Sequence, residues 1–259
     1  RAPKSVSKDS PDRIASELNN LIPKDRKITY DVYQILHSVL DKNSLFEINP
    51  LYGPSLIIGL ARINGQSVGI AANNCGSNAG AMTAEAARKM RRLIELCDTF
   101  HLPIINFIDE PGFMIGLEAE ELGTIKYGMA AVAAAAQATV PWASIRIRKS
   151  FGVASAAHFG PNSYILDWPS VESGALPVEG GVAVAFQRKI ASAENPEKMR
   201  QHLEQKLLKE QSAFAAAESF SSHDIIEPAL TRQHLCRWAN WIQPLLDELS
   251  HPVSFSIRP

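Results

Sequence analysis

SIRIRKSFGVASAAHF, residues 144–159, is the stretch on which the interpretation of the whole sequence depends. Its first half alternates apolar with charged or polar residues, as a strand does. Its second half is a loop of small residues that carries Gly152 and Ser155. This loop allows two kinds of chemistry: either Ser155 is a nucleophile, or the loop acts through its backbone.

The surroundings of Ser155 do not favour a nucleophile. A nucleophile elbow requires Gly-x-Ser-x-Gly, whereas residues 152–156 read GVASA and lack the second glycine. His158 follows three positions later, so we expect it on the same short helix rather than across a cleft. Covalent catalysis also needs a third group that orients the base, and the sequence places no carboxylate there. We therefore expect Ser155 to be a bystander and His158 to be a satisfied helix histidine.

The backbone of this loop is the better candidate. Gly, Val, Ala and Ser at the end of a strand leave N–H groups accessible, and their small side chains let a ligand approach. The start of a helix has N–H groups without intrahelical partners and a partial positive charge. Each well-placed donor of this kind stabilises a developing oxyanion by about 3 kcal/mol.

Asp109 and Glu110 are the other candidate catalytic groups. They are adjacent in a turn, so their side chains are expected to point in different directions. They therefore do not form the paired carboxylates of a glycosidase. The simplest interpretation is that Asp109 bonds nearby backbone at the end of a strand.

Composition narrows the class of protein. The chain has 259 residues, 46% of them apolar, which is enough to bury a sizeable core. Its 26 Lys and Arg nearly cancel its 27 Asp and Glu, so no nucleic-acid partner is expected. No apolar run approaches the roughly 20 residues that span a bilayer, and no signal peptide or metal-ligand spacing is recognisable. The three cysteines, which are far apart in sequence, are expected to be reduced and buried.

Working outward from the loop, periodicity and turn signals predict alternating strands and helices, which indicates an α/β fold with a layered sheet and flanking helices. Residues 1–13 are polar and are expected to form a linker or arm, and residues 14–259 one domain. Thr29 and Thr83 are the expected N-caps of the first two helices, and Asn64-Gly65 is the expected hairpin turn. Strands are expected at 45–48, on both sides of the hairpin turn, and at 103–109, 140–147 and 163–166. Helices are expected at 30–41, 84–100, 117–138, 179–190, within 194–220, and from about 228 onward.

Several longer motifs resemble one known family. They are FEINPLYGPSLIIGLARINGQSVGIAAN (46–73), CDTFHLPIINFIDEPGFMIG (97–116), ATVPWASIRIRKSFG (138–152), WPSVE (168–172), EGGVAV (179–184) and HDIIEPALTR (223–232). Together they resemble the C-terminal half of the carboxyltransferase component of biotin-dependent acyl-CoA carboxylases, the propionyl-CoA and methylcrotonyl-CoA types most closely. The resemblance extends from about Asp12 to about Leu235.

The resemblance implies a crotonase-like fold, in which ββα turns stack as a spiral. It implies an enzyme that moves a carboxyl group from carboxybiotin to the α carbon of an acyl-CoA. Biotin would be attached to a carrier domain and not to this chain. The expected partners are an N-terminal-type carboxyltransferase half, in the same gene or as a separate chain, and a biotin carboxylase with its carrier. A dimer or higher oligomer in the cytoplasm or mitochondrial matrix is expected, with residues 1–13 as the interdomain linker.

The resemblance also implies the site. Backbone N–H groups just after Gly152, those of Val153 and Ala154, would hold the ureido oxygen of biotin. The remaining residues expected to bind substrate or biotin are Asp109, Pro111, Gly112, Phe113, Gly116, Gly123, Phe151, Ser155 and Ala156. No metal site is expected.

Some residues depart from the family's pattern near this site. Val153 replaces a glycine, residues 122–127 replace a Gly-Gly-x-x-Arg-His motif, and Pro177 replaces another glycine. Ala156 stands where a larger side chain often bounds the acyl pocket, so a larger or unusual acyl group is a hypothesis. The departures leave two alternatives open: a biotin-independent enzyme on an acyl thioester (a decarboxylase, a hydrolase or a C–C bond-forming enzyme), or a diverged non-catalytic subunit.

Overall fold

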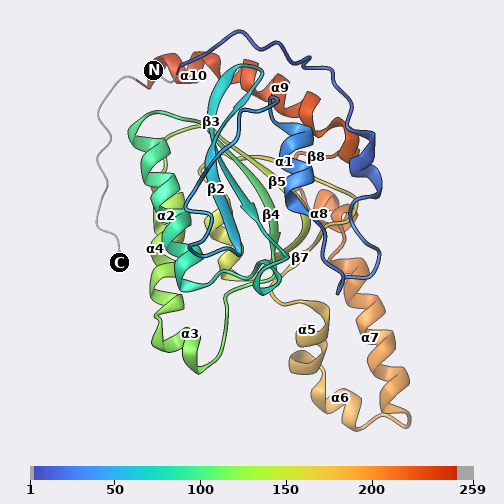
Figure 1. Ribbon diagram of the computed structural model, residues 1–259. Helices are drawn as coiled ribbons and strands as arrows, with labels where there is room; N and C mark the ends of the chain where they lie inside the picture. Colours follow the sequence, from blue (N-terminus) through green and yellow to red (C-terminus); the bar gives the residue numbers. More distant parts are fainter. Residues whose placement is uncertain (1–2, 250–259) are drawn as a thin grey trace.

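A single mixed sheet organises the chain in the computed structural model, which describes residues 3–249 (Figure 1). The strands run in the order β1-β2-β3-β4-β5-β6-β8, and β7 pairs with β5. The β1–β2 and β2–β3 pairings are antiparallel, and all later pairings, from β3–β4 on, are parallel. The strands are β1 (Phe46–Ile48), β2 (Leu56–Ile63), β3 (Gln66–Asn73), β4 (Ile104–Glu110), β5 (Trp142–Phe151), β6 (Tyr164–Asp167), β7 (Glu172–Gly174) and β8 (Asp224–Ile225).

Helices cover both faces of this sheet, as the α/β prediction requires (Figure 1). Helices α2 and α4 lie side by side on one face, and α1 and α9 pack on the other. The α-helices are α1 (Val32–Val39), α2 (Ala84–Thr99), α3 (Leu117–Glu121), α4 (Thr124–Gln137), α5 (Val178–Ala185), α6 (Gln187–Ala191), α7 (Pro196–Glu210), α8 (Ala213–Glu218), α9 (Thr231–Trp241) and α10 (Gln243–Glu248). The 3₁₀ helices are η1 (Ser16–Asn20), η2 (Asn78–Gly80), η3 (Val153–His158) and η4 (Pro228–Leu230).

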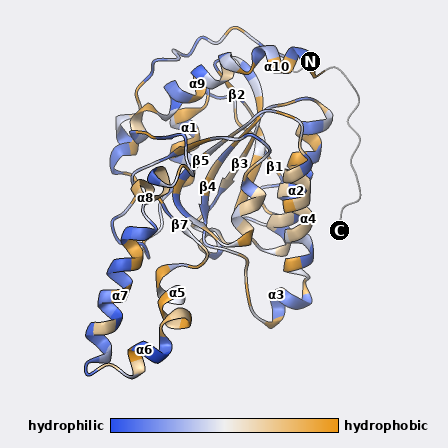
Figure 2. Cartoon of the chain, turned by 180° about the vertical axis from the view of Figure 1, so that it is seen from behind, coloured by the Kyte–Doolittle hydropathy of each residue, from blue (hydrophilic) through white to orange (hydrophobic). Residues whose placement is uncertain are grey.

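Each face of the sheet has its own apolar core. Alternate residues of a strand point to opposite faces, so Ile105 and Phe107 of β4 join α1 and α9, while Ile104 joins α2 and α4. Figure 2 shows apolar residues concentrated in the sheet and in α4, whereas α7 is hydrophilic along much of its length. Helices α5, α6 and α7 extend away from the sheet around a small cluster of their own, which includes Val182 and Leu203.

The local signals of the sequence predict most element boundaries. Asn64 and Gly65 both have positive φ, and they join β2 to β3 as the predicted hairpin turn. The hydroxyl of Thr83 accepts a hydrogen bond from the Ala86 N–H and caps α2, as predicted. Strand β4 and the short helix after β5 also lie where they were expected.

Three expectations about helices are wrong. Asp31, not Thr29, caps α1, because its carboxylate reaches the Tyr33 N–H. The helix expected over 117–138 is divided into α3 and α4, because Gly123 adopts a left-handed conformation between them. The helix expected over 179–190 is divided likewise into α5 and α6 at Phe186.

Residues 3–13 are all exposed or only partly buried, so they are not part of the core. They lie along the β2–β3 hairpin, where the Ser5 N–H donates to the Gly65 carbonyl at 3.0 Å. Residues 1–2 lie outside the described residues, and the assignment of 1–13 as a linker or arm stays a prediction. The three cysteines are unpaired and buried, which also agrees with the sequence. Within residues 3–249, the helices are too short or too polar to cross a membrane.

Candidate active site

The carboxyl ends of β4 and β5 meet at one edge of the sheet and carry most of the candidate residues. The pairing of these strands shifts register between Ile108 and Glu110. At this irregularity the Asp109 carboxylate accepts a hydrogen bond from the Lys149 N–H at 3.0 Å. Such irregularities are common beside active sites, because they redirect the chain at the end of a strand.

Gly152 redirects the chain as it leaves β5. Its φ of 65° and ψ of −165° lie in a region that is essentially restricted to glycine. Its N–H donates to the Gly174 carbonyl of β7 at 3.0 Å. A Cβ atom at this position would meet only the Ala175 carbonyl oxygen, at 3.4 Å. The backbone conformation rather than crowding therefore requires glycine here.

Helix η3 begins directly after Gly152, and its first N–H groups are uncommitted. Among the residues that the structure describes, no acceptor is found for the N–H of Val153 or of Ala154. The Val153 side chain is 57% exposed, whereas Ala154 is fully buried against α4. Val153 does not have positive φ, so its replacement of a glycine introduces no strain.

Ser155 and His158 do not form a nucleophile–base pair. The Ser155 hydroxyl lies 2.7 Å from the Ser150 hydroxyl. His158 is fully buried, with Nδ1 3.2 Å from the Asn106 side-chain oxygen and Nε2 3.0 Å from a Glu110 oxygen. Both ring nitrogens are thus occupied, so His158 is a satisfied histidine, as predicted. That Ser155 is a bystander in the chemistry stays a prediction.

Asp109 is fully buried on the opposite face of β4 from Glu110. Its carboxylate accepts hydrogen bonds from Arg148 at 2.9 Å and from the Tyr30 hydroxyl at 3.0 Å. Burial alone would lower the pKa of Arg148, but the Asp109 carboxylate outweighs it and raises that pKa. Burial, assisted by Asp109, raises the pKa of Tyr30 well above its usual value. The expected divergence of the two carboxylates is confirmed, and Asp109 holds the scaffold rather than facing a ligand.

The turn after β4 is held by Glu110. Its carboxylate accepts a hydrogen bond from the Gly112 N–H at 2.9 Å, and the Gly112 carbonyl accepts one from the Met82 N–H at 3.0 Å. Pro111, Gly112 and Phe113 are each partly exposed. They follow Glu110, which pairs with Ser150 near the end of β5.

The other expected residues occupy less central positions. Gly116 precedes α3 and Gly123 precedes α4, both with positive φ, and α4 packs against η3. The Phe151 side chain is buried, with 1% of its surface exposed, so it is not available to a ligand in this structure. Ala156 is exposed on η3.

A cavity of about 300 Å³ opens beside these strand ends and has a positive lining. Arg26, Lys27, Arg148 and Lys149 contribute the positive charge, and Pro111 forms part of the wall. Cys75 also lines it, and burial raises the pKa of this thiol. The sequence analysis missed this cluster, because Arg26 and Arg148 are far apart in the chain.

Sequence analysis also missed the buried Glu110–His158 pair. Strand alternation places Asn106, Ile108 and Glu110 on one face of β4, which was a usable signal. It did not show that η3 would bring His158 to that face. The Asn73 side chain completes the group by donating at 3.1 Å to the same Glu110 carboxylate oxygen that His158 contacts, and also to the Gly80 carbonyl.

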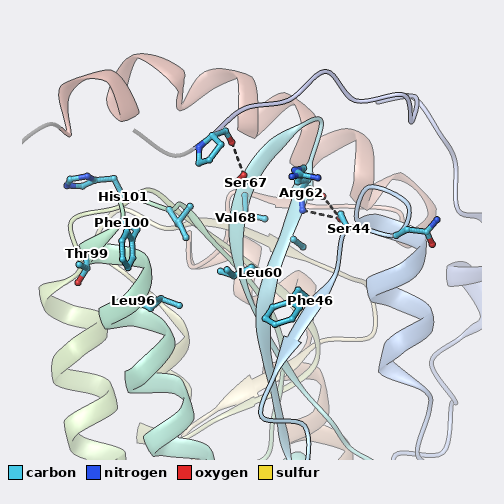
Figure 3. Close-up of a pocket in the computed structure, with 14 residues that line it drawn as sticks. Ser44, Phe46, Leu60, Arg62, Ser67, Val68, Leu96, Thr99, Phe100 and His101 are labelled. Carbon is cyan, nitrogen blue, oxygen red and sulfur yellow. Dashed lines mark hydrogen bonds between the residues drawn. The ribbon is translucent and has the colours of Figure 1, made fainter.

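A larger cavity, of about 760 Å³, lies at the opposite edge of the sheet (Figure 3). Phe46, Leu60, Val68 and Phe100 give it a mainly apolar lining, and its residues Thr99–Leu102 immediately precede β4. None of its described lining residues carries a carboxylate or a thiol. We therefore place the chemistry at the smaller, charged cavity. Over residues 3–249, no group of three or more His, Cys, Asp or Glu is arranged to hold a metal ion.

Comparisons with known proteins identify the domain family of this chain. A family model described as the carboxyl transferase domain matches residues 1–243. The propionyl-CoA carboxylase carboxyltransferase subunit of Haloferax mediterranei is 33% identical over 232 residues, covering 88% of this chain and 45% of that protein. The human mitochondrial propionyl-CoA carboxylase beta chain is 34% identical over 240 residues, covering 91% and 43%. The chain thus spans a little under half the length of these relatives.

A solved structure of a related protein has the same fold as this chain. The crystal structure of transcarboxylase 12S, described as a hexamer with methylmalonyl-coenzyme A and methylmalonic acid bound, superposes with a TM-score of 0.85 and 27% identity. The match covers all of this chain and 48% of that one. The expected crotonase-like fold is therefore confirmed, and the chain belongs to the carboxyl transferase domain family.

Proposed function

We propose that this chain is the biotin-binding half of an acyl-CoA carboxyltransferase. Together with a complementary half, it would move a carboxyl group from carboxybiotin to the α carbon of an acyl-CoA. The observation that supports this most strongly is the pair of uncommitted N–H groups that follows Gly152 at the carboxyl end of β5.

These N–H groups suit the charge that the reaction develops. Biotin supplies a ureido group that carries the carboxyl group and becomes more negative at its oxygen when the carboxyl group leaves. The N–H groups of Val153 and Ala154 start a helix, so they are oriented donors that need not break other bonds first. Each such donor contributes about 3 kcal/mol to stabilising an oxyanion. Gly152 fixes their direction, and Ser155 is not required.

The positive cavity beside the strand ends supports the same proposal. Its four cationic side chains attract an anionic group, such as a carboxylate about to be transferred. Arg148 is held rigidly by Asp109, and Arg26 is paired with Glu172 at 2.7 Å. Lys149 follows Arg148 on the same strand and also lines the cavity, so we assign it the role of attracting the anion.

The exposed apolar side chains near this edge support the proposal that a second protein unit completes the site. Ile115 and Leu117 are 86% and 76% exposed beside α3, and Ile125 is 57% exposed on α4. Such side chains in neighbouring elements are typical of a surface that another protein unit covers. We propose that a complementary half binds here, supplies the acyl-CoA site and the second oxyanion hole, and forms an oligomer like the hexamer of transcarboxylase 12S.

Ala156 affects the size of the acyl group that the site can accept. Its methyl group is exposed on η3, next to the proposed donors. A larger side chain at this position would narrow the space beside them. We therefore propose an acyl-CoA larger than propionyl-CoA as substrate, and a strong preference for propionyl-CoA over longer thioesters would contradict this.

A pair of variants at one residue tests the carboxyltransferase proposal. Val153→Pro removes one N–H at the first position of a helix, where proline is tolerated, and Val153→Ala keeps it. With the chain assembled with its complementary half, carboxyl transfer from a carboxylated acyl-CoA to free biotin is followed with radiolabelled substrate. We expect Val153→Pro to lower kcat by about 10²–10³ and Val153→Ala to stay within about threefold.

The same experiment distinguishes the alternative functions. Turnover of the acyl-CoA that is independent of biotin would favour a decarboxylase, a hydrolase or a C–C bond-forming enzyme. An assembled complex that turns over no acyl-CoA would favour a non-catalytic subunit. Equal activities of Val153→Pro and Val153→Ala would contradict the role of the backbone.

A further inference from the structure

A second positively lined cavity, of about 450 Å³, lies between the β1–β2 edge and helix α2, away from the candidate active site. Three cations on α2, Arg88, Lys89 and Arg92, line it together with Tyr52 and Asn49. Ile48 and Ile58 complete the lining, in which no described residue carries a carboxylate. None of these residues belongs to the proposed carboxyltransferase site.

Lys89 is a buried cation whose charge is only partly compensated by its hydrogen-bond acceptors. It is 3% exposed, and its Nζ donates to the Leu56 carbonyl at 2.6 Å and to the Gly53 carbonyl at 3.5 Å. An ammonium has three donors, and within residues 3–249 no third acceptor and no carboxylate within 4.0 Å is found. Burial lowers the pKa of Lys89, partly opposed by Glu47, whose carboxylate accepts a hydrogen bond from Tyr33. An anion in the cavity would supply the missing countercharge.

The two arginines are placed differently around the cavity. The Arg88 guanidinium stacks on the Tyr127 ring, 3.7 Å from its centroid, and donates to the Tyr52 hydroxyl at 3.4 Å. These contacts hold its direction. Arg92 is exposed, and no hydrogen bond or ion pair is found for its guanidinium in the described part of the chain. Arg91, its neighbour, is instead paired with Glu95 at 2.9 Å and does not line the cavity.

We propose that this cavity binds a phosphate group. Two guanidinium groups and one ammonium carry three positive charges, which suits a phosphate dianion better than a single carboxylate. The apolar side chains of Ile48 and Ile58 and the ring of Tyr52 leave space for an organic molecule attached to the phosphate. The phosphate group is thus the common ligand, whether it is free or carried by a small organic compound.

Isothermal titration calorimetry on the full chain at low ionic strength tests this, with inorganic phosphate, AMP and adenosine as probes. We expect saturable binding of phosphate and AMP that Arg92→Gln and Arg88→Gln each weaken at least tenfold, and no binding of adenosine. Arg91→Gln is the matched control and should bind within twofold of the unaltered chain. AMP binding more tightly than phosphate would indicate an organic phosphate, and equal affinities would indicate free phosphate.

Two results would overturn the proposal. One is the absence of saturable binding of phosphate or AMP up to about 10 mM, which corresponds to a binding free energy weaker than about 3 kcal/mol. The other is equal weakening by Arg91→Gln and Arg92→Gln, which would show only a general effect of charge. Because the assay measures binding, its outcome is independent of the proposed carboxyl transfer.

Discussion

Gly152→Ala is the substitution that most sharply tests how the loop after β5 is built. The backbone of Gly152 lies at φ 65° and ψ −165°, which costs a residue with a Cβ about 1–3 kcal/mol. The new Cβ would be 3.4 Å from the Ala175 carbonyl oxygen, an ordinary contact, so no steric term is added. Alanine also lowers the conformational entropy of the unfolded chain, which stabilises the folded state by roughly 0.4–1 kcal/mol. We expect a net loss of about 1–2 kcal/mol in the free energy of unfolding.

The same substitution should affect catalysis more than stability. The strain can be relieved by rotating the peptide between residues 152 and 153, which turns the Val153 N–H away from its present direction. Loss of one oxyanion donor lowers kcat by about 10²–10³. Urea denaturation and the biotin carboxylation assay measure the two effects. Gly180→Ala is the control, because Gly180 lies in helix α5 with nothing within 4 Å of a new Cβ, so stability should not fall.

An unaltered kcat in Gly152→Ala, together with an unaltered free energy of unfolding, would contradict a directing role for Gly152. It would mean that the loop does not need a glycine conformation and that the direction of the Val153 N–H is not fixed by it.

Three further predictions concern the scaffold. Asp109→Asn leaves Arg148 buried without its partner carboxylate, so the free energy of unfolding measured by urea denaturation should fall by about 3–5 kcal/mol. The control variant Asp12→Asn, at an exposed position, should be about as stable as the unaltered chain. Burial lowers the pKa of His234 below 6.5, so below that pH the unfolded chain takes up a proton first. The free energy of unfolding should therefore fall as pH decreases from 7 through 6.5 toward the pKa of His234 in the folded chain, and His234→Gln should lose this dependence. If the pH profiles of His234→Gln and the unaltered chain were parallel, this prediction would be wrong. The three cysteines are buried, and burial raises the pKa of Cys236 to about 11, so a thiol reagent at pH 8 should label them only after denaturation.

The fold could be predicted largely because its signals are local. The hairpin at Asn64-Gly65, the Thr83 cap and the strand before Asp109 each depend on a few neighbouring residues. The wrong helix boundaries have local causes too, because one left-handed glycine, Gly123, divides a helix that its composition favours.

The candidate site was harder to predict, because its contacts join distant segments. Tyr30, Asp109 and Arg148 form one buried group, although they come from the segment before α1, from β4 and from β5. Glu110 and His158 meet only because η3 folds back under the end of β4. The sequence predicted the loop at Gly152 correctly, but neither periodicity nor spacing indicated which side chains would surround it.

We propose above that the backbone N–H groups after Gly152 bind the ureido oxygen of biotin. A crystal structure of the assembled carboxyltransferase with biotin bound tests this most directly. We expect the ureido oxygen at about 2.7–3.1 Å from the backbone nitrogens of Val153 and Ala154. Biotin bound elsewhere, or these two N–H groups donating to protein carbonyls in the complex, would contradict it.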